Sequence, residues 1–193
     1  MGRLVGFRPD AAPLSLASGP PLAVREKSMN QGANPPLPLG DLSVRALIAA
    51  ISSERPSPGA GAAGAIVLAL AAACAGKAAT IALKHRPEDA ELQRAVESFA
   101  QIALRALLAG DADAAAFERF LHDKQQSQAW QLILTDETLV QLSNELIAAA
   151  NAIESRTEWT LAGDFAAARL LAQASRMIHE RNIAEAKASS GRS

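Results

Sequence analysis

The sequence predicts an all-α protein: a single-domain bundle of about five or six helices around an alanine-rich central helix. Hydrophobic residues make up 49% of the 193 residues and aromatic residues only 4%. Alanine, the best helix former, supplies much of the apolar fraction. Apolar residues recur at alternating steps of three and four, and we find no strand pattern and no internal repeat. Because alanine-rich helices bury little area each, we expect two copies to associate as a dimer.

The charge and the cysteine content argue against a nucleic-acid-binding protein, a disulfide-bonded protein and a metal-binding protein. The net charge is −1, which gives no indication of a nucleic-acid surface. Cys74 is the single cysteine, so neither an intrachain disulfide nor a cysteine metal cluster is expected. His122 and His179 have no metal-ligand spacing with any partner, and we predict no metal. A cytoplasmic location fits these features best.

The sequence predicts one domain with a segment outside it at each end. Seven of the ten prolines lie before residue 40, and small residues fill much of the rest of that segment. This composition predicts a disordered arm over residues 1–39, with Met29 as an alternative start of translation. No sustained apolar core follows Arg3 and Arg8, so a signal peptide is not expected. The domain is predicted over 40–188 and a short tail over 189–193.

The central helix is predicted to follow the turn around Pro58. Gly59 and Gly61 give this turn backbone freedom, and the N–H groups at the helix start suit an anion. The stretch is nearly long enough to span a membrane, but Lys77 interrupts it, so we favour a core helix. Its predicted apolar stripe is Ala63, Val67, Leu70, Cys74, Lys77, Ile81 and Lys84.

Two further helices flank the central one in the sequence. A short helix is predicted over Leu42–Ser53, with Asp41 or Ser43 as its cap. Another begins after Pro87, and Gly110 either lies within it or divides it in two. Its apolar stripe is Leu92, Val96, Phe99, Ala103, Ala106, Gly110, Asp113, Phe117 and Phe120.

The last third of the chain predicts two more helices. Residues 123–135 fit no clear pattern. Thr135 or Asp136 is then expected to cap a helix with the stripe Leu139, Leu142, Leu146, Ala149 and Ile153. After a turn at 157–160, the final helix carries the stripe Leu171, Ala174, Ile178 and Asn182.

Four charged residues are candidates for chemistry. Asp113 falls on an apolar stripe, so it is either a cleft carboxylate or the cap of a helix that begins after Gly110. Lys77 either reaches solvent at the helix end or pairs with a buried carboxylate such as Asp113. Lys84 belongs to a small basic cluster that is either solvated or binds a polyanionic tail. Asp164 either serves as a first-turn acid or contributes to a site.

The segment PSPGAGAAG, preceded by the helix DLSVRALIAAISS, resembles the glycine turn of the cyclodeaminase/cyclohydrolase family. That family includes the cyclodeaminase domain of formiminotransferase-cyclodeaminase and the bacterial methenyltetrahydrofolate cyclohydrolases. The segment GDADAAAF is similar to the family's acidic helix and matches its aspartate to Asp113. Asp164 matches a second family aspartate, and Asn182 matches the last asparagine. The resemblance covers about residues 40 to 187.

The resemblance implies a soluble helical homodimer that binds a reduced folate, often with its glutamate tail, and needs no metal or redox cofactor. The implied reaction is hydrolysis of methenyltetrahydrofolate to formyltetrahydrofolate, or the related cyclodeamination of formiminotetrahydrofolate. Asp113 would be the catalytic carboxylate. The implied substrate-binding residues are Pro58, Gly59, Gly61, Lys77, Lys84, Asp164 and Asn182.

Departures from the family pattern leave a second hypothesis open. Ala60 and Ala62 stand where the family has glycine and serine or glycine, and Thr80-Ile81-Ala82 occupies the place of the family's Asn-Leu-Thr. The family's Leu-Pro-Lys is also missing. The alternative is therefore a catalytically silent member that binds a folate, another pterin or a protein. A membrane-associated helical protein is a weaker third reading.

Overall fold

The computed structural model describes residues 37–123 and 126–190. Contacts divide the chain into Met1–Pro35 and Pro36–Ser193, and the fold below is that of the second unit. Residues 1–36 of the predicted arm, Met29 among them, and residues 191–193 of the predicted tail lie outside the described residues.

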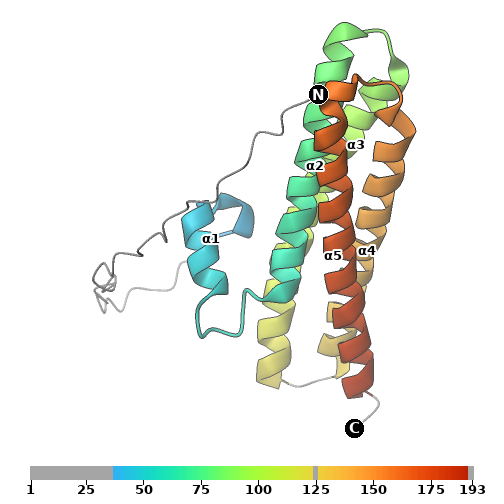
Figure 1. Ribbon diagram of the computed structural model, residues 1–193. Helices are drawn as coiled ribbons and strands as arrows, with labels where there is room; N and C mark the ends of the chain where they lie inside the picture. The colour runs from blue at the N-terminus through green and yellow to red at the C-terminus, as the bar shows by residue number, and fades with distance from the viewer. Residues whose placement is uncertain (1–36, 124–125, 191–193) are drawn as a thin grey trace, which may run out of the picture. The chain divides into compact units, whose positions relative to one another are not determined.

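Four long helices form the bundle, and the part of the chain that the structure describes contains no strand. They are α2 (Ala60–His85), α3 (Ala90–Asp123), α4 (Gln126–Glu154) and α5 (Ala162–Ser190). Short connections make successive helices antiparallel neighbours. The contacts run from α2 to α3, from α3 to α4, from α4 to α5 and from α5 back to α2, so α2 and α4 are diagonal (Figure 1). The predicted all-α bundle is confirmed.

Two short elements precede the bundle. The 3₁₀ turn η1 (Leu39–Asp41) buries Leu39, whose N–H donates to Oδ1 of Asp111 at 2.7 Å and so ties η1 to α3. Helix α1 (Val44–Ile51) is capped by Ser43, whose side chain accepts from the N–H of Ala46. None of the residues of α1 is buried.

The buried face of α2 differs from the predicted stripe. Leu70, Lys77 and Lys84 of that stripe are exposed. Apart from Leu68, the buried positions are small residues: Gly61, Ala62, Gly64, Ala65, Ala69, Ala71, Ala72, Ala75, Ala78, Ala79 and Ala82. Small side chains let the neighbouring helices approach closely, and Leu70 is left exposed on the outer side. By length and composition α2 could also cross a membrane, and here it packs against α3, α4 and α5.

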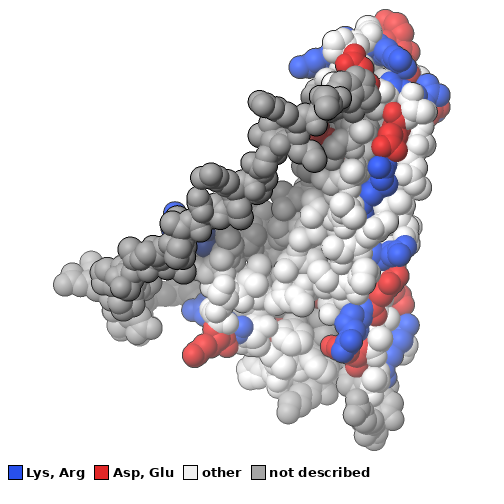
Figure 2. Space-filling model, in the orientation of Figure 1, with Lys and Arg blue, Asp and Glu red and all other residues white. Residues whose placement is uncertain are grey.

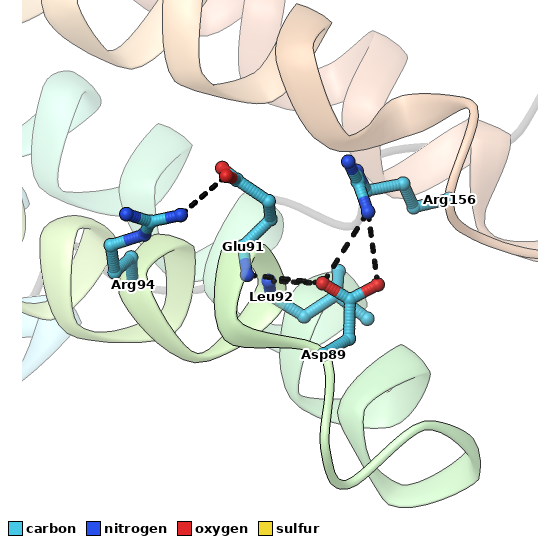
Figure 3. A network of polar contacts seen from close by, with 5 residues as sticks. All are labelled: Asp89, Glu91, Leu92, Arg94 and Arg156. Atoms are coloured by element: carbon cyan, nitrogen blue, oxygen red, sulfur yellow. Dashed lines mark hydrogen bonds and ion pairs between the residues drawn. The ribbon is translucent and has the colours of Figure 1, made fainter.

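Helix α3 runs through Gly110 without a break, so it is one helix and not two. A Cβ at residue 110 would lie 2.8 Å from the Cβ of Ala65, which shows that α2 and α3 approach closely there. At the start of α3, Asp89 accepts hydrogen bonds from the N–H groups of Glu91 and Leu92, and Arg156 binds the same carboxylate (Figure 3). This network joins the first turn of α3 to the segment after α4.

Helix α4 begins at Gln126, ten residues earlier than predicted. It takes in most of the segment that fitted no pattern, so the prediction that Thr135 or Asp136 caps a helix is wrong. The 3₁₀ turn η2 (Trp159–Leu161) then leads into α5. The buried face of α5 is Phe165, Ala168, Ala172, Ser175 and His179, one residue away from the predicted stripe of Leu171, Ala174 and Ile178.

Candidate functional site

The segment before α2 is held against the middle of α3. Ser57 is buried, and its Oγ donates to the carbonyl oxygen of Ala114 at 3.1 Å. Gly59 is the N-cap residue of α2, and its carbonyl oxygen accepts the first helical bond, from Ala63 N–H. Because Ala114 follows Asp113 directly, this hydrogen bond places the start of α2 beside the Asp113 carboxyl.

Asp113 lies in the interior of α3 and is 6% exposed. It is therefore not a helix cap. A Cβ at residue 61 would lie 2.2 Å from its Oδ2, so only glycine leaves room for this carboxyl against the α2 backbone. Burial, followed by the negative charge of Asp136, raises the pKa of Asp113 from 3.8 to about 6, and His179 acts against that rise. A carboxyl with such a pKa can give up and take back a proton near neutral pH.

A second carboxylate, Asp136 from α4, faces the same place. It is 2% exposed, and its Oδ1 lies 2.6 Å from Nδ1 of His179 and 3.3 Å from Nδ2 of Asn182. Because a carboxylate only accepts, Nδ1 of His179 is the donor in this pair. His179 is fully buried, and its Nε2 has no hydrogen-bond partner among the described residues.

Ser57, Asp113, Asp136 and Asn182 border a cavity of about 370 Å³ at one end of the bundle, and His179 is not among its lining residues. Pro56, Ser57, Gly59, Ala60 and Gly61 line it from the start of α2, Asp113, Ala114, Phe117 and Phe120 from α3, Ala129, Leu132 and Asp136 from α4, and Asn182, Glu185 and Ala186 from α5. The walls are mostly apolar, with two phenylalanine side chains. The charged lining residues described are all acidic, which favours a ligand with positive charge near the carboxylates. In the described parts of the chain, no group of three or more His, Cys, Asp or Glu side chains is arranged to hold a metal ion.

The structure brings four of the predicted site residues to this cavity: Gly59, Gly61, Asp113 and Asn182. Pro58 is not among the lining residues but stands between two of them, Ser57 and Gly59. The structure shows that these residues lie close together around the cavity. Their roles in binding and catalysis stay predictions.

The other three predicted residues lie elsewhere. Lys77 Nζ is 3.1 Å from Oδ2 of Asp164, so the suggested pairing of Lys77 with Asp113 is wrong. At 1.5 Å per residue, Lys77 stands about 24 Å and Lys84 about 35 Å along α2 from Gly61. A binding role for Lys77, Lys84 or Asp164 therefore requires a ligand that extends well beyond the cavity.

Asp136, His179 and Ser57 were not predicted as site residues. For Asp136 the signal was present, because it continues the α4 stripe that starts at Leu139 one step of three earlier. The same spacing singled out Asp113. The sequence offers His179 only as a possible metal ligand, because its hydrogen bond to Asp136 joins residues 43 positions apart.

A family model described as formiminotransferase-cyclodeaminase matches residues 43–184. Among solved structures, the chain is similar to formiminotetrahydrofolate cyclodeaminase from Thermotoga maritima, with a TM-score of 0.75 and 21% identity over 78% of this chain and 81% of that one. No curated protein matches the chain. The structural likeness shows the fold, and the family match covers well over half of the sequence. The chain belongs to the formiminotransferase-cyclodeaminase family.

Proposed function

We propose that the chain is a folate one-carbon enzyme that hydrolyses methenyltetrahydrofolate to formyltetrahydrofolate, or carries out the related cyclodeamination of formiminotetrahydrofolate. The observation that carries the proposal is the Asp113 carboxyl, which is buried at the cavity and has a pKa of about 6. Family membership supports the folate chemistry. The proposed substrate is the folate itself, and the reaction as written uses water and protons with no further cofactor.

In the hydrolysis, water attacks the carbon that bridges the two folate nitrogens. The Asp113 carboxylate takes one proton from that water and passes it to the nitrogen whose bond to the carbon breaks. The carbon keeps the water oxygen as a formyl group, and the second water proton leaves to solvent. One cation and one water thus give one neutral formyl group and one proton.

In the cyclodeamination, the free folate nitrogen attacks the formimino carbon and closes the ring. The bond from that carbon to the terminal nitrogen then breaks. The leaving nitrogen takes two protons, the one given up by the attacking folate nitrogen and one donated by protonated Asp113, and departs as ammonia. Both reactions therefore use the same carboxyl in opposite protonation states.

The cavity suits this substrate in size and character. Its volume of about 370 Å³ falls within the range of small-molecule sites, roughly 300–1,000 Å³. Phe117, Phe120 and Leu132 offer apolar surface for a flat heterocycle, and Asp113 and Asp136 offer negative charge to the cationic methenyl bridge. We also propose that the protein acts as a cytoplasmic homodimer, and that a polyglutamate tail extends outside the cavity.

The decisive experiment follows the methenyltetrahydrofolate chromophore with the wild-type protein and with Asp113→Asn. We expect wild-type turnover, and a loss on the order of a hundredfold or more in the variant, as for removal of a general acid/base. Equal turnover by the two proteins would remove Asp113 from the chemistry. Folate binding without turnover by the wild type would favour the silent family member, for which the altered residues Ala60 and Ala62 at the turn argue.

A further inference from the structure

The two carboxylates of the cavity differ in their hydrogen bonds. Oδ1 of Asp136 accepts from His179 at 2.6 Å and from Asn182 at 3.3 Å. The carboxyl of Asp113 has no hydrogen bond to any described residue. Donors stabilise the ionised form of a carboxylate, and a neighbouring negative charge disfavours it. The environment therefore distinguishes the two groups: Asp136 is held by two hydrogen-bond donors, whereas Asp113 is free to exchange a proton.

The ring of His179 has little free space around it. Its ring is fully buried, and a Cβ at residue 64 of α2 would lie 2.7 Å from its Nε2 and 3.1 Å from its Cε1. Gly64 therefore gives the ring the space it fills. The ring is confined between α2 and α4, and its Nδ1–H is directed at Oδ1 of Asp136.

The charged groups around Asp113 come from two neighbouring helices. Asp136 is the contribution of α4, and α5 contributes His179 and Glu185, which pairs with Arg181 at 2.5 Å. Among the described lining residues, the start of α2 contributes none. Gly61 and Gly64 face Asp113 and His179 respectively and are about 4.5 Å apart along α2, so the carboxyl and the imidazole occupy adjacent positions on this helix.

We propose that Asp136 is a second catalytic carboxylate, which stabilises positive charge on the bound one-carbon unit, and that His179 is the positioning residue that holds it. This inference rests on the proposed function. Asp136 forms and breaks no covalent bond in the reaction. It faces the methenyl cation, whose charge is shared by the two nitrogens, while Asp113 moves the proton.

The first test measures how well the cavity distinguishes a cation from a neutral ligand. Asp113→Asn and the double variant Asp113→Asn/Asp136→Asn are compared, because both lack the proton-transferring carboxyl. The probes are methenyltetrahydrofolate, which is cationic at the bridge, and formyltetrahydrofolate, which is neutral there. We expect the affinity ratio of the two probes to fall on the order of tenfold in the double variant, equivalent to about 1.4 kcal/mol. An unchanged ratio, or equal weakening of both probes, overturns the role of Asp136.

The second test concerns His179 and uses turnover by otherwise unaltered protein. His179→Phe keeps a ring but loses the Nδ1 donor, whereas the amide of His179→Asn can donate to Asp136 again. We expect His179→Phe to lower kcat and the cation-to-neutral affinity ratio, and His179→Asn to recover part of both. Ser175→Ala is the matched control, because Ser175 is equally buried one turn away on α5 and its Oγ has no partner among the described residues. If His179→Phe lowers only the melting temperature, as a structural residue would, the positioning role is refuted.

Failure of this inference is distinguishable from failure of the proposed function. A wild-type protein that neither turns over nor binds either folate refutes the proposed function. A wild-type protein that turns over, together with an unchanged affinity ratio on loss of Asp136, refutes the second carboxylate alone.

Discussion

Gly61 of α2 and Asp113 of α3 lie so close that a Cβ on residue 61 would stand 2.2 Å from the carboxyl oxygen of Asp113. The position of the proposed catalytic carboxyl is thus set by the absence of a side chain on the neighbouring helix. Gly64 has the same relation to His179, at 2.7 Å. Both contacts can be tested by adding one methyl group.

Gly61→Ala is expected to displace the Asp113 carboxyl. Because a short side chain can turn aside more easily than a helix backbone can move, the free energy of unfolding should fall modestly, by about 1–3 kcal/mol. Turnover should fall much more than this loss of stability explains. Gly163→Ala is the control, since a Cβ there meets nothing within 4 Å. Assays at a temperature where both variants are folded would separate the two effects, and full activity of Gly61→Ala would contradict the proposed geometry.

Gly64→Ala should destabilise the protein through His179. The ring is fully buried, and a Cβ at residue 64 also meets Ile178 at 3.2 Å, so neither neighbour can yield cheaply. We expect a loss of about 1–3 kcal/mol in denaturant unfolding. The matched control is Gly76→Ala in the same helix, where the nearest atom lies at an ordinary 3.5 Å. There the higher helix propensity of alanine should leave stability unchanged or raise it by up to about 1 kcal/mol.

Asp113 should make the protein less stable as the pH rises. Its pKa of about 6 in the folded state lies above the ordinary 3.8, so the folded protein binds more protons between these values. The contribution is fully favourable below about pH 4 and is lost as the pH rises through 6, by about 3 kcal/mol in all. Asp113→Asn removes this dependence. We expect the variant to be more stable than the wild type at pH 7, and the difference to disappear near pH 4. Parallel stability curves for the two proteins would show that the pKa is not raised.

Arg156→Met should act on stability in the opposite pH direction. Desolvation tends to raise the pKa of Asp89, but hydrogen bonds from Leu92 N–H, Arg156 and Glu91 N–H outweigh it and lower the pKa. The stabilisation is therefore present above the unfolded pKa and is lost as the pH falls through the folded one. We expect Arg156→Met to lower the melting temperature at pH 7 and to leave it nearly unchanged in strong acid. A loss of the same size at both pH values would point to packing instead.

The predicted dimer has a candidate face on α2 and α5. The Lys77–Asp164 pair and the contact of residue 64 with Ile178 set the register of these antiparallel helices, and place exposed Leu70 opposite residue 171. Leu170 and Met177 are exposed on α5. Figure 2 shows a largely uncharged surface over α2 and α5, with charged residues gathered at its edges. We expect sedimentation to give a dimer for the wild type and a monomer for Leu70→Glu, with Thr80→Glu as the exposed control on α2. A monomeric wild type at micromolar concentration would refute the dimer.

The helical class was predictable because alanine content and three-four spacing are local properties. Asp113 was predictable for the same reason, since a carboxylate on an apolar stripe is visible in the sequence. The buried face of α2 was not. Spacing analysis takes Val67 and Leu70 as core residues, whereas close helix packing buries the glycines and alanines and leaves Leu70 exposed. The face of a helix made of small residues depends on how near its neighbours lie, which is a tertiary property.

Asp136 and His179 were missed for different physical reasons. The polar start of α4 gives no apolar period, so the pattern predicts a later start for this helix and puts Asp136 at its cap. His179 gains its role from a partner on another helix, and pairing between helices leaves no spacing signal. The cavity is lined by residues from four segments that are far apart in the sequence. Which of these residues lie together can be seen only in the packed bundle.

The last turns of α5 supply Asn182, Glu185 and Ala186 to the cavity, and the helix ends at Ser190. Helix ends open more easily than helix centres, so this wall belongs to the least cooperative part of the bundle. A ligand that contacts these last turns of α5 while they are helical stabilises them against local unfolding. Amide hydrogens near the end of α5 should then exchange with solvent more slowly in the bound protein, while those in the middle of α2 should change little. Hydrogen exchange at this helix end would therefore report occupancy of the cavity even for a ligand that is not turned over.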